Sequence, residues 1–377
     1  MPSTTLRKQI MAGVRSIVVK AGTNLLTCEN GKLDQTVIAS LTDQIATLIE
    51  RGVKVTLVSS GAVGAGMGKT GVARRPRSMP VLQAVAAIGQ PSLMSMYERE
   101  FARHELLVGQ VLVTRKDFEQ RNRYVNISNT ISALQRLKAV PIINENDTVA
   151  IDELDRFADN DTIAAMVTNL LRADLLVLLT VVDGLLDSGG QLVDLVPAVN
   201  TEVKSLARAE RSPLGSGGMF SKLGAARMVS EAGECVVIAN GREPGALLRL
   251  LNGERVGTIF APAARKLSAR QRWIVGAARP TGVIVVDAGA ANAVHTQGKS
   301  LLARGVTRIE GKFDRGSIVQ IAGPDGRVLA HGISNYSSTE LAMIKGLKSC
   351  EIAAALGSKP FDEAVHRDNL VIIAGQR

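Results

Sequence analysis

The chain is poor in aromatic and cysteine residues and lacks long apolar runs. Aromatic residues make up 3% of its 377 residues, so a hydrophobic core must be built mainly from aliphatic side chains. No apolar run reaches the ~18 residues that a membrane-spanning helix needs. Cys28, Cys235 and Cys350 are far apart and show no CxxC spacing, which argues against a disulfide framework or a zinc site. We therefore expect a cytoplasmic protein with no membrane partner.

The charge balance is basic, because 45 lysine and arginine residues stand against 35 acidic ones, for a formal charge of +10. This excess favours an anionic partner: a nucleotide, an acidic metabolite or a nucleic acid. It is spread along the chain, with one local cluster between Arg265 and Arg272. We interpret that cluster as the solvated face of a linker helix.

Hydrophobic residues make up 46% of the chain, and its length suits two domains. In the first part, short apolar runs alternate with segments of helical period, which is typical of an open, mostly parallel sheet sandwiched by helices. We therefore predict an α/β domain over residues 1–264. Its expected strands are 16–20, 53–59, 107–113, 140–143 and 174–180, and its expected helices are 35–50, 80–97, 127–137 and 162–171.

The pattern changes after Trp273, where short β-like runs are separated by turns rich in Gly, Asp and Pro. We predict a linker at 265–279, a small β-rich barrel at 280–362 and a C-terminal tail at 363–377. The expected strands of this barrel are 282–287, 300–302, 306–310, 317–322 and 328–333.

The segment from Gly215 to Lys222 places glycines and a lysine just before a helical pattern. Glycines let the backbone approach a ligand, and successive N–H groups can hold phosphate oxygens. The spacing does not match a P-loop, since Ser221 precedes the lysine and Leu223 follows it. If this loop holds phosphates, it does so in another kinase architecture.

Polar and glycine residues also follow the predicted strands, at Lys20–Asn24, Ser59–Gly66, Asn144–Asp147 and Thr180, and Asp159–Asp161 begins a helix. Each alone could be a turn, a helix cap or a solvated strand end. Ligands of open parallel sheets bind at the carboxyl ends of the strands, so the convergence of all these residues favours a phosphoryl-transfer site.

None of the four histidines lies in these loops. A site without histidine favours chemistry that needs no general base, such as phosphorylation of a carboxylate. A carboxylate substrate is already ionised at neutral pH, since a side-chain carboxyl group of this kind ordinarily has a pKa of ~4.3. The protein then has only to align it and to neutralise charge on the transferring phosphoryl group.

Five motifs together resemble the amino acid kinase family. They are Val18–Thr23, Val58–Val63, Pro141–Asp147, Asp159–Asp161, and Gly215–Met219 with Lys222. The later segments Lys266–Ile274, Gly282–Asp287 and His331–Ser334 are similar to a PUA domain. The resemblance covers nearly the whole chain and implies an amino acid kinase fold followed by a PUA domain.

The resemblance implies ATP-dependent phosphorylation of the side-chain carboxylate of L-glutamate, the first step of proline biosynthesis. It further implies Mg²⁺ carried by ATP and inhibition by proline. We expect a homo-oligomer, and we do not expect a nucleic acid as the main partner.

By the family pattern, Lys20 and Lys222 stabilise the phosphoryl group and Asp161 holds the two lysines. No metal ligand is predicted within the protein. The residues expected to bind glutamate are Ser60, Gly61, Asn144, Asp147 and Asn160. Those expected to bind the nucleotide are Lys20, Gly22, Thr180, Val181, Ser216, Gly217, Gly218, Met219, Phe220, Ser221 and Lys222. Relatives commonly carry Thr-Asp and Gly-Leu-Tyr here, so Val181 and Leu186 depart from the pattern.

Two other interpretations remain. A related kinase could act on acetylglutamate, aspartate, carbamate or UMP, although the Asn-Glu-Asn-Asp loop favours a free amino acid. The PUA-like segment could instead bind RNA. The scarcity of aromatic residues for base stacking and the scattered basic charge argue against that second interpretation.

Overall fold

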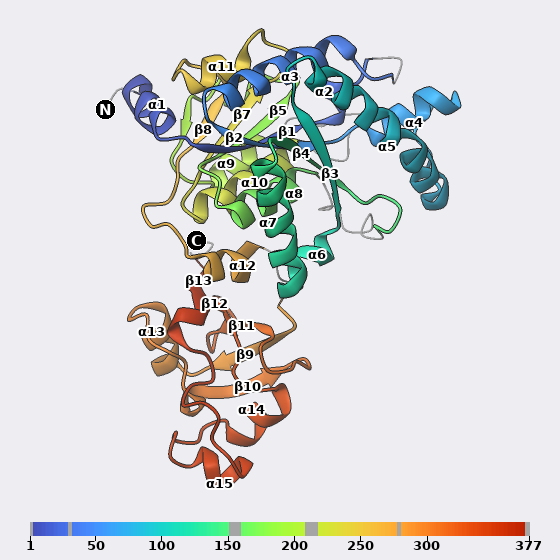
Figure 1. Cartoon of the computed structure of the whole chain (residues 1–377). Helices are drawn as coiled ribbons and strands as arrows, with labels where there is room; N and C mark the ends of the chain where they lie inside the picture. Colours follow the sequence, from blue (N-terminus) through green and yellow to red (C-terminus); the bar gives the residue numbers. More distant parts are fainter. Residues whose placement is uncertain (1–2, 29–31, 151–159, 208–217, 277–279, 374–377) are drawn as a thin grey trace. The chain divides into compact units, whose positions relative to one another are not determined.

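The computed structural model describes residues 3–28, 32–150, 160–207, 218–276 and 280–373. The chain forms two compact units, Met1–Lys266 and Leu267–Arg377 (Figure 1). In the described part, no helix is long and apolar enough to cross a membrane. All three cysteines are free thiols.

The first unit is built on an eight-stranded sheet with the order β3-β4-β2-β1-β5-β7-β8-β6. All neighbouring strands are parallel except β7 and β8. The strands are β1 (Ser16–Ala21), β2 (Lys54–Ser59), β3 (Leu107–Val113), β4 (Ala139–Glu145), β5 (Leu175–Thr180), β6 (Leu195–Val196), β7 (Cys235–Asn240) and β8 (Thr258–Phe260). The predicted parallel sheet is therefore confirmed.

Helices cover both faces of this sheet, because its central strands carry apolar side chains on both sides. The helices α1 (Ser3–Ala12), α3 (Gln35–Glu50), α5 (Met79–Ala102) and α11 (Ala246–Leu251) share one core with alternate residues of the strands. The helices α7 (Arg121–Arg136), α8 (Asn160–Leu171) and α10 (Met219–Glu231) lie on the opposite face (Figure 1). Shorter helices are α2 (Thr23–Leu26), α4 (Ala62–Thr70), α6 (Arg115–Glu119) and α9 (Thr201–Leu206).

Helices α4 and α5 pack closely through two glycines. A Cβ atom added to Gly89 would lie 1.9 Å from the carbonyl oxygen of Ala62 and 2.3 Å from the backbone nitrogen of Gly66. Both atoms belong to the backbone of α4, so they cannot move aside as a flexible side chain would. The absence of side chains at these positions therefore sets how near α5 lies to the start of α4.

Replacing Gly89 with alanine should push α4 away from α5. We expect a loss of about 1–3 kcal/mol in the free energy of unfolding, as for other overpacked contacts. Gly224→Ala is the matched control, because Gly224 lies in helix α10 with open space where its Cβ would be. Urea unfolding of both variants tests this, and equal stabilities of the two would contradict the close contact.

The second unit contains a five-stranded sheet with the order β10-β9-β11-β12-β13. Its core is formed by side chains of the strands and of the neighbouring helices. The strands are β9 (Gly282–Val286), β10 (Val306–Glu310), β11 (Ile318–Ala322), β12 (Val328–Ile333) and β13 (Leu370–Ile372). The helices are α12 (Ala269–Gly276), α13 (Ala288–His295), α14 (Ser338–Ile344) and α15 (Ile352–Leu356).

The structure describes local elements in three predicted segments of this unit. The expected strand at 300–302 is wrong, because Leu301 forms only an isolated bridge with Val365 and a 3-10 turn begins at Ala303. Helix α12, in the predicted linker 265–279, belongs to the second unit. Strand β13, in the predicted tail 363–377, pairs with β12.

Candidate functional site

Several of the predicted site residues lie at the ends of four neighbouring strands. The strands β4, β2, β1 and β5 lie side by side and parallel, so their carboxyl ends meet at one edge of the sheet. Lys20 lies near the end of β1, Ser60 follows β2, and Asn144 lies near the end of β4. The start of α8 supplies Asn160 and Asp161 to the same edge.

A buried carboxylate lies between two buried lysines. The Nζ atom of Lys20 lies 2.6 Å from one carboxylate oxygen of Asp161, and that of Lys222 lies 3.1 Å from the other. Asp161 is fully buried, and Lys20 and Lys222 are only 3% and 7% exposed. The structure therefore brings together all three residues that we predicted to be catalytic. The cluster thus joins two cationic side chains to one anionic side chain.

Its surroundings keep Asp161 ionised. Burial alone would raise the pKa of this carboxyl group, but the ammonium groups of Lys20 and Lys222 outweigh burial and lower it to about 2. Asp161 also lies in the first turn of α8, where the helix dipole favours a negative charge. The Oγ atom of Ser221 donates a further hydrogen bond of 2.8 Å to Asp161.

This lowered pKa predicts how stability depends on pH. The pKa of Asp161 is lower in the folded than in the unfolded protein, so the ionised carboxylate stabilises the fold. This stabilisation, about 2 kcal/mol, is fully present above pH ~4 and is lost as the pH falls through about 2. We expect the stability difference between wild type and Asp161→Asn to be constant near neutrality and to shrink in acid. Urea titrations across this range measure it; a difference that does not shrink between about pH 4 and pH 2 would contradict the lowered pKa.

Polar side chains next to the lysine cluster form a connected set of amides. The Nδ2 atom of Asn160 donates to the hydroxyl of Ser60 at 2.8 Å and to the Oδ1 atom of Asn144 at 3.0 Å. Asn144 in turn donates from Nδ2 to Gln90 on α5 at 2.9 Å. Three predicted glutamate-binding residues are thus in contact. Gln90 was not predicted, because in the sequence it is one polar residue within a helical pattern and belongs to no motif.

The two other residues predicted to bind glutamate, Gly61 and Asp147, lie in the adjoining loops. Gly61 has a φ of +108°, a conformation that residues with side chains rarely adopt, and it precedes the first residue of helix α4. The free N–H groups of that helix start are suited to a carboxylate. Asp147 is half-buried in the turn that follows β4, three residues after Asn144.

The predicted nucleotide-binding residues lie near Lys20, at the start of α10 and at the end of β5. Gly22 lies beside the lysine cluster, since a Cβ there would be 3.4 Å from the Nζ atom of Lys20. Helix α10 begins with Met219, Phe220 and Ser221, and Gly218 is its N-cap. Thr180 is the last residue of β5. Phe220 and Val181 are 51% and 38% exposed, so both are accessible to a ligand. Ser216 and Gly217 lie outside the described residues.

Leu186, the other departure from the family pattern, pairs in an isolated antiparallel bridge with Leu192. Asp183, two residues after Val181, accepts a hydrogen bond of 2.9 Å from Asn240 at the end of β7. The carboxylate nearest to Thr180 along this loop is therefore already bonded to the protein.

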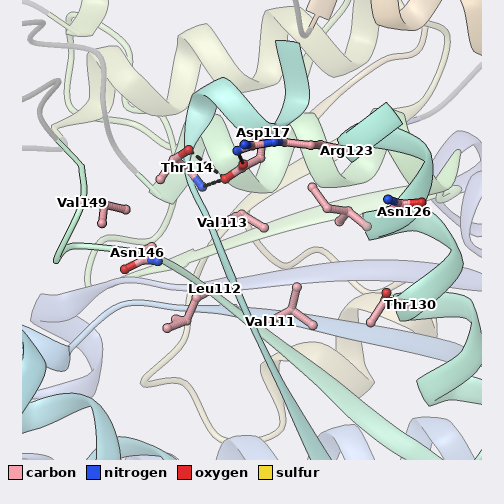
Figure 2. Close-up of a pocket in the computed structure, with 11 residues that line it drawn as sticks. Val111, Leu112, Val113, Thr114, Asp117, Arg123, Asn126, Thr130, Asn146 and Val149 are labelled. Carbon is pink, nitrogen blue, oxygen red and sulfur yellow. Dashed lines mark hydrogen bonds and ion pairs between the residues drawn. The ribbon is translucent and has the colours of Figure 1, made fainter. Parts of the chain in front are cut away.

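A cavity of about 440 Å³ lies at the end of the edge strand β3 (Figure 2). It contains none of the predicted site residues, but Asn146, within the Asn144–Asp147 loop, is part of its wall. The backbone nitrogen of Asn146 donates to the carbonyl of Val113 at 2.8 Å, which attaches the loop to β3. Thr114 caps helix α6 here and donates to the carboxylate of Asp117, which also contacts Arg123. The residues that line the cavity are Val111, Leu112, Val113, Thr114, Asp117, Arg123, Asn126, Ile127, Thr130, Asn146 and Val149.

Over the described ranges, no group of three or more His, Cys, Asp or Glu side chains is placed to hold a metal ion. In the site itself, both oxygens of Asp161 face lysine ammonium groups. The donor set around the lysines is thus suited to anionic groups rather than to a resident cation.

The sheet, the buried lysine pair and the second unit together define a class of protein. Residues 15–240 match the amino acid kinase family and residues 282–356 match the PUA domain. This chain belongs to the amino acid kinase family, and it carries a PUA domain, as the motifs predicted.

Its curated relatives give a narrower class. Glutamate 5-kinase of Trichlorobacter lovleyi is 42% identical over 374 residues, which is 98% of this chain and 99% of the relative. Glutamate 5-kinase of Moorella thermoacetica is 44% identical over 369 residues, covering 96% and 97% of the two chains. Among solved structures, carbamate kinase from Giardia lamblia bound to AMP-PNP covers 67% of this chain and 99% of its own, with 17% identity and a TM-score of 0.48.

Proposed function

We propose that this chain is a glutamate 5-kinase, which transfers the γ-phosphoryl group of ATP to the side-chain carboxylate of L-glutamate. The observation that carries the proposal is the buried Lys20–Asp161–Lys222 cluster beside the amides of Asn144 and Asn160. Relatives with this name match nearly the full length of the chain. The reaction is the first step of proline biosynthesis.

In this mechanism the substrate carboxylate attacks the γ-phosphorus directly, so no side chain has to remove a proton. Negative charge on the transferring group is balanced by Lys20 and Lys222. Asp161 holds both ammonium groups and keeps them apart, so their positions are set before the substrates bind. Preorganised charge in a water-poor site stabilises the transition state more than mobile charge in solvent does.

The amide cluster is proposed to bind the amino acid end of glutamate. Ser60 and Asn160 supply short polar contacts, and Asp147 supplies a carboxylate for the α-ammonium group. The helix start after Gly61 offers N–H donors to a carboxylate. Because Asn160 and Asp161 are consecutive, the same helix start positions both ends of the substrate.

The nucleotide is proposed to lie along Thr180 and the start of α10, with Gly22 leaving room near Lys20. The Mg²⁺ ion that accompanies ATP is expected to arrive on the phosphates of the nucleotide, since magnesium is commonly bound through substrate phosphates.

The direct test is trapping of the acyl phosphate with hydroxylamine in the presence of ATP and glutamate. We expect hydroxamate and ADP in equal amounts. Acetylglutamate, aspartate, carbamate and UMP serve as competing acceptors, and turnover on one of them without turnover on glutamate would replace this proposal. Steep salt-dependent RNA binding with no kinase activity would favour the RNA-binding alternative.

Two further properties are proposed from the family resemblance. Proline should inhibit the enzyme, and a glutamate titration with and without millimolar proline tests it; superimposable curves would exclude inhibition. The chain should also form a homo-oligomer, for which light scattering gives the mass. A mass of one chain at micromolar concentration would exclude it.

A further inference from the structure

The amide network leaves one donor and one acceptor without partners. Within the part of the chain that the structure describes, the buried Nε2 atom of Gln90 and the buried Oδ1 atom of Asn160 have no hydrogen-bond partner. A buried polar group without a partner costs about 1–3 kcal/mol, and native proteins contain few of them. Such a pair within a candidate site therefore indicates a ligand.

The orientation of each amide follows from two backbone groups. The backbone N–H of Glu145 can only donate, and it meets Asn144 at 2.8 Å, so that atom of Asn144 is its oxygen. The Nδ2 atom of Asn144 must then face the oxygen of Gln90, at 2.9 Å. This leaves the Nε2 group of Gln90 as a free donor.

The same reasoning orients Asn160. The carbonyl oxygen of Ser59 can only accept, and it lies 3.4 Å from the Nδ2 atom of Asn160. That nitrogen also meets the Oδ1 atom of Asn144, which already accepts from Glu145. The Oδ1 atom of Asn160 is left as a free acceptor.

We propose that Gln90 is a specificity-determining residue that donates from Nε2 to the α-carboxylate of the acceptor amino acid. This inference rests on the proposed function. An α-amino acid carries a carboxylate that can accept from Gln90 and an ammonium group that can donate to Asn160. The reacting carboxylate belongs beside Lys20 and Lys222, so the carboxylate at the amide cluster is the α-carboxylate.

The test uses Gln90→Glu, which keeps an oxygen to accept from Asn144 but replaces the donor with an acceptor. Gln90→Met adds no charge but removes both the donor and the oxygen that accepts from Asn144. We expect either change to raise KM for glutamate roughly 10- to 100-fold, while kcat and KM for ATP stay within about threefold. Gln135→Glu is the matched control, because Gln135 is a half-buried glutamine on α7 that donates to Thr56 within β2, away from the loops.

A substrate lacking the α-carboxylate separates a direct contact from a structural role. The compound 4-aminobutyrate is glutamate without that group, and its inhibition constant against glutamate can be measured without turnover. We expect this constant to be unchanged in Gln90→Met, the variant that adds no charge beside the ammonium group.

Three results would decide against the inference or its basis. An unchanged KM for glutamate in both variants would mean that a water molecule, not substrate, meets Gln90. An equal loss for glutamate and 4-aminobutyrate would mean a purely structural role. Absence of hydroxamate from the wild-type chain would instead overturn the proposed function, before any variant is compared.

Discussion

Replacing Lys222 with alanine should lower kcat about 1000-fold while KM for glutamate and for ATP changes only a few-fold. Lys222 is buried and its Nζ atom lies 3.1 Å from Asp161, so its charge is fixed close to the path proposed for the phosphoryl group. Charge on the transferring group is redistributed during transfer, so this contact should strengthen in the transition state. Steady-state kinetics with glutamate and ATP varied separately measure the effect.

Arg227→Ala is the matched control for that variant. Arg227 lies on the same helix, α10, but is paired with Glu231 at 2.7 Å, one helical turn later in the chain. We expect its kinetics to match those of the wild type. If Lys222→Ala instead raises KM and leaves kcat unchanged, Lys222 binds the ground state of a substrate and has no special role in transfer.

Replacing Asp161 with asparagine should damage both turnover and stability. The change leaves the ammonium groups of Lys20 and Lys222 buried without their shared counter-charge. Removing one partner of a buried charge pair costs about 3–5 kcal/mol, and we expect a loss of that size in the free energy of unfolding. Turnover should fall at least as far as in Lys222→Ala, because both lysines lose the group that positions them.

A double variant separates charge from packing. Lys222→Met removes one of the two cations, so adding it to Asp161→Asn should recover part of the lost stability. The recovery is measured by urea unfolding of the wild type, both single variants and the double variant. Strictly additive losses would show that Asp161 and Lys222 do not interact in the folded protein.

Much of the fold followed from patterns local to each segment. The helix at 35–50 and the strand at 107–113 have the predicted bounds, because apolar periodicity continues to their ends. Helix α7 begins at Arg121, six residues before the predicted 127, because its first turns are polar and carry no apolar period. The strand at 300–302 failed since a short apolar run does not by itself supply a neighbouring strand.

The sequence by itself determined the family, the parallel sheet and the loops proposed to carry the chemistry, because strand order along the chain and the rule of carboxyl-end binding need no coordinates. It also indicated Lys20, Asp161 and Lys222 through the family motifs. The contacts among those residues were decided by the tertiary structure, since Lys20, Asp161 and Lys222 lie on β1, α8 and α10, which are far apart in the chain. In the fold, α8 packs against both β1 and α10. Only the tertiary structure identified Gln90 as a candidate site residue. A glutamine in a helix is one polar residue among many until α5 places it 2.9 Å from Asn144 and leaves its amide nitrogen without a partner among the described residues.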